Sequence, residues 1–86
     1  MADGQEHFSR QAWVRLQEHE AAYPGQPYAT VLRLRQSRPK ADISALAQEF
    51  SEMVGSPASP QAFRQLLYHA RRKFMELMIE LGYRGP

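Results

Sequence analysis

Residues 59–74 read SPQAFRQLLYHARRKF, and they begin the longest helix that the sequence predicts. Ser59 suits the N-cap, and Pro60 suits the first helical position, where its missing N–H loses no intrahelical partner. Neither proline nor glycine follows until Gly82, so the helix is expected to end near Leu81. At about 100° per residue, its apolar side chains form one arc that predicts a core-packing face. The members of this arc are Phe63, Leu66, Leu67, Ala70, Phe74, Leu77, Met78 and Leu81.

A second side of this helix is polar and basic. Gln61, Arg64, Gln65, Tyr68 and Arg72 form what we call the polar strip, with Arg71 beside it, His69 at its far edge and Lys73 next in sequence. Guanidinium groups bind phosphates or guanine O6 and N7, and glutamine amides bind adenine. The first carboxylate is Glu76, and the N-terminus capped by Ser59 adds partial positive charge. The strip therefore predicts a DNA-binding surface, although basic helix faces are also common as plain solvated surface.

Proline and glycine divide the preceding chain into three shorter helices. A first helix is expected from Ser9 to about Tyr23, where residues 24–27 read PGQP and end it. A second is expected over residues 28–37, before Pro39. A third is expected over residues 43–54, with Asp42 as N-cap and Gly55 just past its end. Its apolar stripe is Ile43, Leu46, Ala47, Phe50 and Val54.

Length and composition limit the classes of protein to which the chain can belong. Eighty-six residues, 43% of them hydrophobic, form one small domain. Because the chain has no cysteine, disulfides, thiol catalysis and cysteine-ligated metal centres are excluded. Neither a membrane-spanning run nor a signal-peptide core is present, so a cytoplasmic protein is expected. The net charge of +2 hides two acid-free segments, residues 27–41 and residues 59–75, each with four Lys or Arg.

No segment alternates with period two for long, so the predicted fold is all-α, a four-helix domain. A short helix, a glycine-containing turn and a capped basic helix together outline a helix-turn-helix over about residues 42–81. The domain is expected to cover residues 9–82, between a flexible N-terminus of residues 1–8 and a tail of residues 83–86.

Catalysis finds no support in the sequence. His7, His19 and His69 lack ligand spacing, no Ser lies in a triad motif, and no glycine-rich phosphate loop is present. The sequence thus predicts no enzyme activity, no metal, no cofactor and no small-molecule substrate.

Several other side chains are expected to pack or to meet a protein partner. Trp13 is interpreted as a packing anchor. Arg33 and Arg35 lie about 200° apart on their helix, so one part of that basic segment is expected in solvent and another part in an ion pair with Glu49 or Glu52. Met75 and Ile79 lie off the apolar arc, where they either pack on the first helix, the interpretation we favour, or form an exposed apolar patch. A tentative partner-binding set is Arg33, Arg35, Met75 and Ile79.

The stretch FRQLLYHARRKF at residues 63–74 resembles the recognition helix in bacterial RNA polymerase sigma factors of the extracytoplasmic-function type. Leu67 and Phe74 match the two leucines of the family pattern, and Ala70 its alanine. Residues 71–73 match its basic run. Residues 31–35, VLRLR, and residues 42–50, DISALAQEF, are similar to two upstream segments of the same domain. The resemblance covers residues 28–81, with one departure: the chain is longer than the family pattern between Phe50 and Phe63, which predicts a lengthened turn.

The resemblance implies the C-terminal sigma domain, region four, which binds the −35 promoter element and packs on the β-subunit flap of RNA polymerase. By position, Arg64 and Gln65 match base-reading residues. Residues matched to positions near the DNA backbone are Gln61, Tyr68, Arg71 and Arg72. The helix at residues 28–38 matches the part that meets the flap. Because 86 residues leave no room for the sigma domain that melts the −10 element, the chain is expected to be an excised domain or a stand-alone sigma-four-like protein, with the first preferred.

Two functions follow as hypotheses. The first is sequence-specific binding of double-stranded promoter DNA in transcription initiation, with Arg71, Arg72 and Lys73 neutralising phosphates. The alternative is a helical module that binds RNA polymerase, an anti-sigma-like protein or a second copy of itself, without DNA contact.

Overall fold

The computed structural model describes residues 3–84, with side-chain surroundings from Glu6 onward. It contains four helices, α1 (Asp3–Ala22), α2 (Tyr28–Ser37), α3 (Ile43–Val54) and α4 (Pro60–Glu80). Every regular element in this part of the chain is helical, which confirms the all-α, four-helix prediction. None of these helices combines the length and the apolar character that crossing a membrane requires.

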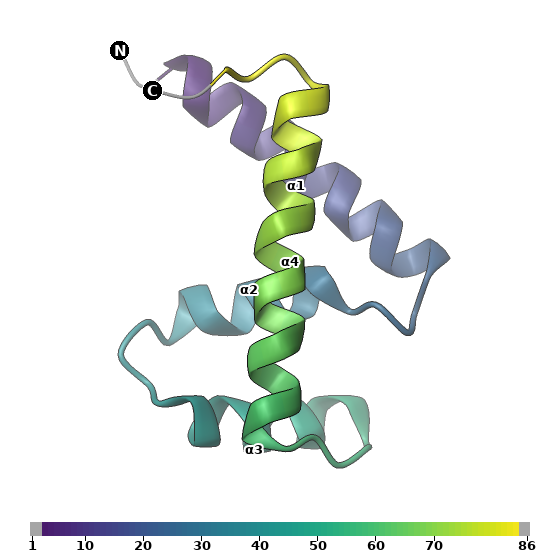
Figure 1. Ribbon diagram of the computed structural model, residues 1–86, viewed down its shortest axis with the longest axis vertical. Coiled ribbons are helices and arrows are strands. Elements are labelled where there is room, and N and C mark those ends of the chain that lie inside the picture. The colour runs from purple at the N-terminus through teal and green to yellow at the C-terminus, as the bar shows by residue number, and fades with distance from the viewer. Residues whose placement is uncertain (1–2, 85–86) are drawn as a thin grey trace.

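Helix α4 lies across the other three helices, and each of them packs against it (Figure 1). Helix α2 contacts both α1 and α3, so it occupies the middle of the layer behind α4. The smallest extent of the molecule is 16 Å, against 39 Å and 29 Å in the other two directions, as expected for two layers of helices. In this arrangement one face of α4 is turned toward the other helices and the opposite face is not.

The predicted apolar arc of α4 forms this packed face. Its buried members are Phe63, Leu67, Ala70, Leu77 and Met78, and Leu66, Phe74 and Leu81 are partly buried against them. Phe63 is 0% exposed and meets Phe50 of α3 with ring centroids 5.6 Å apart. The Trp13 ring of α1 packs edge-on against Phe74 at 6.4 Å, which confirms its role as a packing anchor.

The predicted caps of α3 and α4 are also confirmed. The Asp42 carboxylate accepts a hydrogen bond from the Ala45 N–H at 2.8 Å, and the Ser59 hydroxyl accepts one from the Ala62 N–H at 3.0 Å. Gly55 ends α3 with φ of +71°, in the left-handed region that glycine enters without a Cβ penalty. Short-range signals therefore determine where both helices of the α3–α4 pair begin and end.

The predicted start of the first helix at Ser9 is wrong, because α1 begins at Asp3 and Ser9 lies inside it. The Phe8 ring packs edge-on against Tyr83, with centroids 6.0 Å apart, and also lies beside Gly82. This contact gives the first turns of α1 an apolar partner at the far end of the chain. Residues 1–2 of the expected flexible N-terminus and residues 85–86 of the expected tail lie outside the described residues.

Helix α2 is capped by a side chain from another helix. Pro27 stands at its N-cap position and makes no side-chain cap. Instead, the Glu20 carboxylate of α1 accepts hydrogen bonds from the Thr30 N–H at 2.9 Å and the Thr30 hydroxyl at 2.7 Å. One carboxylate thereby satisfies a free donor of α2 and fixes α2 against α1.

Replacing Glu20 with alanine is expected to lower the free energy of unfolding by about 1–2 kcal/mol, because the Thr30 N–H loses a charge-assisted partner. Urea unfolding followed by circular dichroism measures this change. Glu18, an exposed carboxylate on the same helix, supplies the control, since Glu18→Ala is expected to stay within about 0.5 kcal/mol of the unsubstituted chain. Equal effects of the two substitutions would contradict a capping role for Glu20.

Candidate nucleic-acid interface

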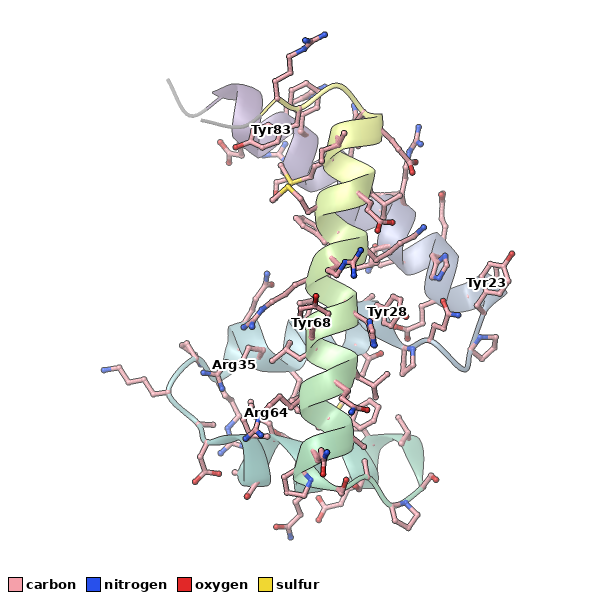
Figure 2. All side chains as sticks on the ribbon, in the orientation of Figure 1. Tyr23, Tyr28, Arg35, Arg64, Tyr68 and Tyr83 are labelled. Carbon is pink, nitrogen blue, oxygen red and sulfur yellow. The ribbon has the colours of Figure 1, made fainter. Side chains whose placement is uncertain are left out.

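The polar strip lies on the face of α4 that the other helices leave open. All five of its side chains are exposed, and Tyr68 retains 57% of its surface. Figure 2 shows Tyr68 on the front of α4, away from the layer that α1, α2 and α3 form behind it, and Arg64 at the side of α4, over α3 in this view. All five residues are thus accessible to a partner, and their contact with DNA stays a prediction.

Basic side chains flank the polar strip on both sides. At about 100° per residue, Gln61, Gln65, Tyr68 and Arg72 point in similar directions around the helix axis. Arg64 and Arg71 turn to one side of that direction, and His69 and Lys73 turn to the other. Arg64, Arg71 and His69 are exposed, and Lys73 is half-buried. The open face of α4 therefore presents both polar and basic groups, the kinds of donor that bind base edges and phosphates in a major groove.

The cations of α4 form no ion pair with the side chains that the structure describes. Among the side chains described between Glu6 and Arg84, the ion pairs are Arg10–Glu6 at 3.4 Å and Arg38–Glu49 at 2.8 Å, and neither involves α4. The Arg72 guanidinium lies over the Tyr68 ring at 5.9 Å, and His69 meets the same ring edge-on at 5.4 Å. These contacts orient Arg72 without neutralising it, so its N–H donors stay available for an anion.

Ser59 lies at the N-terminal end of the polar strip. Its side-chain oxygen accepts from the Ala62 N–H, and the residue is exposed. The hydroxyl proton has no partner among the described residues, so Ser59 can cap α4 and still donate to an external acceptor.

Arginines of the other basic segment, residues 27–41, make contacts inside the fold. The Arg33 guanidinium lies over the Trp13 ring at 5.3 Å. Arg35 is half-buried and donates to the carbonyl oxygens of Ala41 at 2.7 Å and Pro39 at 3.0 Å. The ion pair expected with Glu49 is present and comes from Arg38. Arg33 and Arg35 thus have roles within the fold, and their assignment to partner binding stays a prediction.

The interpretation that Met75 and Ile79 pack on the first helix is wrong. Their side chains are 47% and 60% exposed. Helix α1 packs against the opposite side of α4, whereas Met75 and Ile79 continue the direction of Tyr68 along the open face. Both side chains are exposed, which favours the alternative that they form an exposed apolar patch.

Outside α4, the groups best suited to chemistry among the described residues are candidate metal ligands and histidine ring nitrogens. Between residues 3 and 84, no cluster of His, Asp or Glu is arranged to hold a metal ion. His7 contacts the Gln11 amide at 3.1 Å, and His19 contacts the Gln26 amide at 2.7 Å and stacks on the Tyr28 ring at 5.8 Å. Both histidines therefore join local packing and hydrogen bonding.

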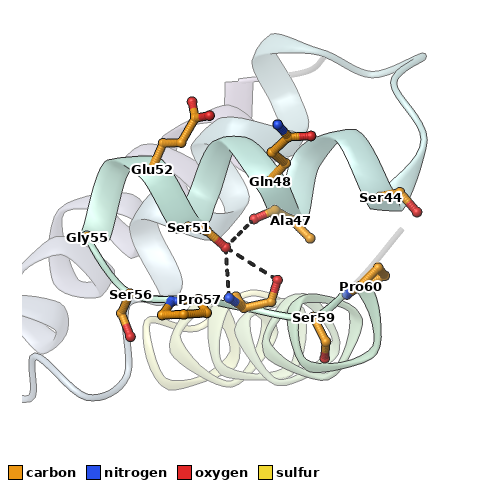
Figure 3. A pocket seen from close by; sticks show the side chains of 11 residues that line it. Ser44, Ala47, Gln48, Ser51, Glu52, Gly55, Ser56, Pro57, Ser59 and Pro60 are labelled. Carbon is orange, nitrogen blue, oxygen red and sulfur yellow. Dashed lines mark hydrogen bonds between the residues drawn. The ribbon is translucent and has the colours of Figure 1, made fainter.

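One open hollow lies where α3, the α3–α4 connection and the start of α4 meet (Figure 3). Its lining includes Ser44, Gln48, Ser51, Ser56 and Ser59. Sequence reasoning missed Ser51, which hydrogen-bonds across the α3–α4 connection. A serine in the last turns of a helix carries no local signal of such a contact, because its partner is fixed only by the path of the connection.

Comparison with known protein families, with curated proteins and with solved structures finds no match to this chain. The resemblance of residues 28–81 to sigma factors therefore stays a prediction that rests on the residues themselves.

Proposed function

We propose that this chain binds double-stranded DNA in a sequence-specific manner, with the polar strip of α4 in the major groove. Arg64 and Gln65 contact base edges in this proposal. The groups that contact phosphates are Ser59, Gln61, Tyr68, His69, Arg71, Arg72 and Lys73.

One observation carries this proposal. Roughly four turns of α4 hold four cations, of which Arg64, Arg71 and Arg72 are exposed and Lys73 is half-buried, with no carboxylate and no ion pair among the described residues. Like charges held this close repel one another in the free protein, and a polyanion relieves that repulsion. A plain solvated helix face more commonly mixes both signs of charge.

The dimensions of α4 suit the groove. A helix with side chains is about 10–12 Å across, and the major groove of B-DNA is about 12 Å wide. The open face of α4 has no packed neighbour, so nothing in the described fold obstructs its approach to DNA. The remaining helices sit behind α4 and set its orientation.

The sigma-factor resemblance supplies the class of DNA and partner within the same proposal. It points to a promoter element of the −35 type in bacterial transcription initiation. It also points to the β-subunit flap of RNA polymerase as a protein partner that meets α2, and to an anti-sigma protein as a possible regulator. The cytoplasm is the corresponding compartment.

Arg64→Ala and Lys73→Ala are expected to weaken DNA binding in different ways. Arg64→Ala should relax preference at one base position by about 1–3 kcal/mol, whereas Lys73→Ala should weaken all sequences alike. The measurement uses duplexes selected from a randomised pool by the unsubstituted chain, together with all single-base variants of the selected sequence. Arg10→Ala on α1 is the control and should change neither property. Identical profiles for the Arg64 and Lys73 variants would contradict base reading by Arg64.

The exposure of Met75 and Ile79 favours a second candidate function, a protein-interaction module that makes no DNA contact. Amide chemical-shift mapping separates the two candidates. Shifts over residues 61–72 on addition of duplex DNA support the proposal above. The alternative is supported if residues 61–72 show no shifts with DNA and residues around Met75 and Ile79 shift on addition of RNA polymerase.

A further inference from the structure

The polar groups of the α3–α4 connection converge on Ser51, a half-buried residue near the end of α3. The Ser51 carbonyl accepts from the N–H groups of Gly55 at 2.9 Å and Ser56 at 3.2 Å. The Ser51 hydroxyl oxygen accepts from the Ala58 N–H at 2.8 Å. One residue therefore holds both the start and the end of the connection.

The hydroxyl proton of Ser51 also has a defined direction. The Ser51 hydroxyl oxygen lies 2.8 Å from the Ala47 carbonyl oxygen and 3.3 Å from that of Ala58, so the shorter hydrogen bond that it donates leads back into α3 (Figure 3). The side chain thereby links the carbonyl of Ala47, inside α3, to the N–H of Ala58, directly before the N-cap of α4. Removal of the hydroxyl leaves the Ala58 N–H without this partner.

Contacts of two different kinds join α3 to the beginning of α4 and to the connection directly before it. Phe50 and Phe63 pack their rings with centroids 5.6 Å apart and an interplanar angle of 59°, a tilted contact between aromatic rings. The hydrogen bond from Ala58 to Ser51 is directional. Arg64 and Gln65 lie in the second turn of α4, so a change in the direction of the chain at Ala58 moves both side chains.

We propose that Ser51 is a positioning residue: together with the packing of α1, α2 and α3, it sets the angle of α4 and thereby the fit of Arg64 and Gln65 to base edges. The assignment rests on the proposed DNA-binding function. Ser51 itself touches no DNA in this account and acts through the Ala58 N–H.

The test compares Ser51→Ala with Ser51→Thr, which keeps the hydroxyl, and with Ser44→Ala. Ser44 is the matched control because it is an exposed serine on the same helix and lines the same hollow. Alanine is the best helix former, so Ser51→Ala is not expected to unfold α3. The probes are the duplex selected from a randomised pool and a scrambled duplex of the same composition.

Ser51→Ala is expected to lower the ratio of selected to scrambled affinity by about tenfold, the scale of one base contact. The salt dependence of binding should stay unchanged because the phosphate contacts remain. Ser51→Thr should restore the ratio, and Ser44→Ala should leave it as in the unsubstituted chain. An unchanged ratio in Ser51→Ala, or an equal fall in Ser44→Ala, would overturn the proposal.

A second measurement separates failure of this proposal from failure of the proposed function. Because the chain has no cysteine, Gln48→Cys and Glu76→Cys place one spin label each on α3 and α4. Adding Ser51→Ala should shift or broaden the distance distribution between the labels, and Ser51→Thr should restore it. If the unsubstituted chain binds no duplex, the proposed function fails. An unchanged distance distribution with Ser51→Ala would then refute positioning by Ser51 as well, and a changed one would uphold it.

Discussion

Reversing the charges of Arg71 and Arg72 to glutamate is expected to weaken duplex DNA binding at least a hundredfold. Two charge-assisted phosphate contacts are lost, each worth about 1.5–3 kcal/mol, and two carboxylates are introduced beside the phosphates. Both arginines are exposed and have no ion-pair partner among the described residues, so the fold should be retained. Fluorescence anisotropy with the selected duplex measures the loss, and circular dichroism checks the helix content.

The double reversal Arg10→Glu with Arg15→Glu is the matched control for this prediction. These two exposed arginines lie on α1, and their reversal changes the net charge by the same amount. If the DNA-binding surface lies on α4, the affinity of the α1 variant for DNA should stay within a few-fold of that of the unsubstituted chain. Equal losses in the two variants would mean that net charge alone governs binding and that α4 holds no site.

Phe63→Ala is expected to be the most destabilising single substitution considered for this fold. Phe63 is fully buried and packs on Phe50, so its removal should lower the free energy of unfolding by about 3–5 kcal/mol. Small domains of this kind have about 5–15 kcal/mol in total, so this single substitution should remove a large share of the stability. Its DNA binding should fall in step with the unfolded fraction.

Urea unfolding at 25 °C tests this expectation, with Tyr68→Ala as the control. Tyr68 is on the same helix but is 57% exposed, so its truncation should change stability by less than about 1 kcal/mol. If Phe63→Ala also remained within about 1 kcal/mol of the unsubstituted chain, the contact between α3 and α4 would not be the main support of the helix pair.

Local signals predicted most of the α3–α4 pair. Asp42, Gly55 and Ser59 act within a few residues of their own positions, through caps and backbone conformation, so a sequence reader can locate them. The apolar arc of α4 was predictable for the same reason, because helical spacing alone determines which side chains share a face.

Long-range contacts account for what the sequence did not predict. The early start of α1 depends on Phe8 meeting Tyr83, at the other end of the chain. The cap of α2 comes from Glu20, on a different helix. Neither partner carries a local signal, so both became visible only once the helices were placed.

Met75 and Ile79 show a related limit. Helical spacing put them near the direction of Tyr68, but it could not tell which side of α4 the first helix would cover. The prediction that Met75 and Ile79 pack on the first helix was wrong because it assigned the first helix to the wrong side of α4. The same limit applied to Arg33 and Arg35. The contact of Arg33 with Trp13 depends on how α1 and α2 meet. The hydrogen bonds of Arg35 to the Pro39 and Ala41 carbonyls depend on the path of the α2–α3 connection.

The dependence of duplex DNA affinity on salt concentration tests the central claim, that the uncompensated cations of α4 neutralise DNA phosphates. With Arg71, Arg72 and Lys73 each neutralising a phosphate, the logarithm of affinity should fall against the logarithm of salt concentration with a slope of about −3. A titration of the unsubstituted chain between about 50 and 200 mM salt determines this slope. A slope near zero would contradict DNA binding by α4.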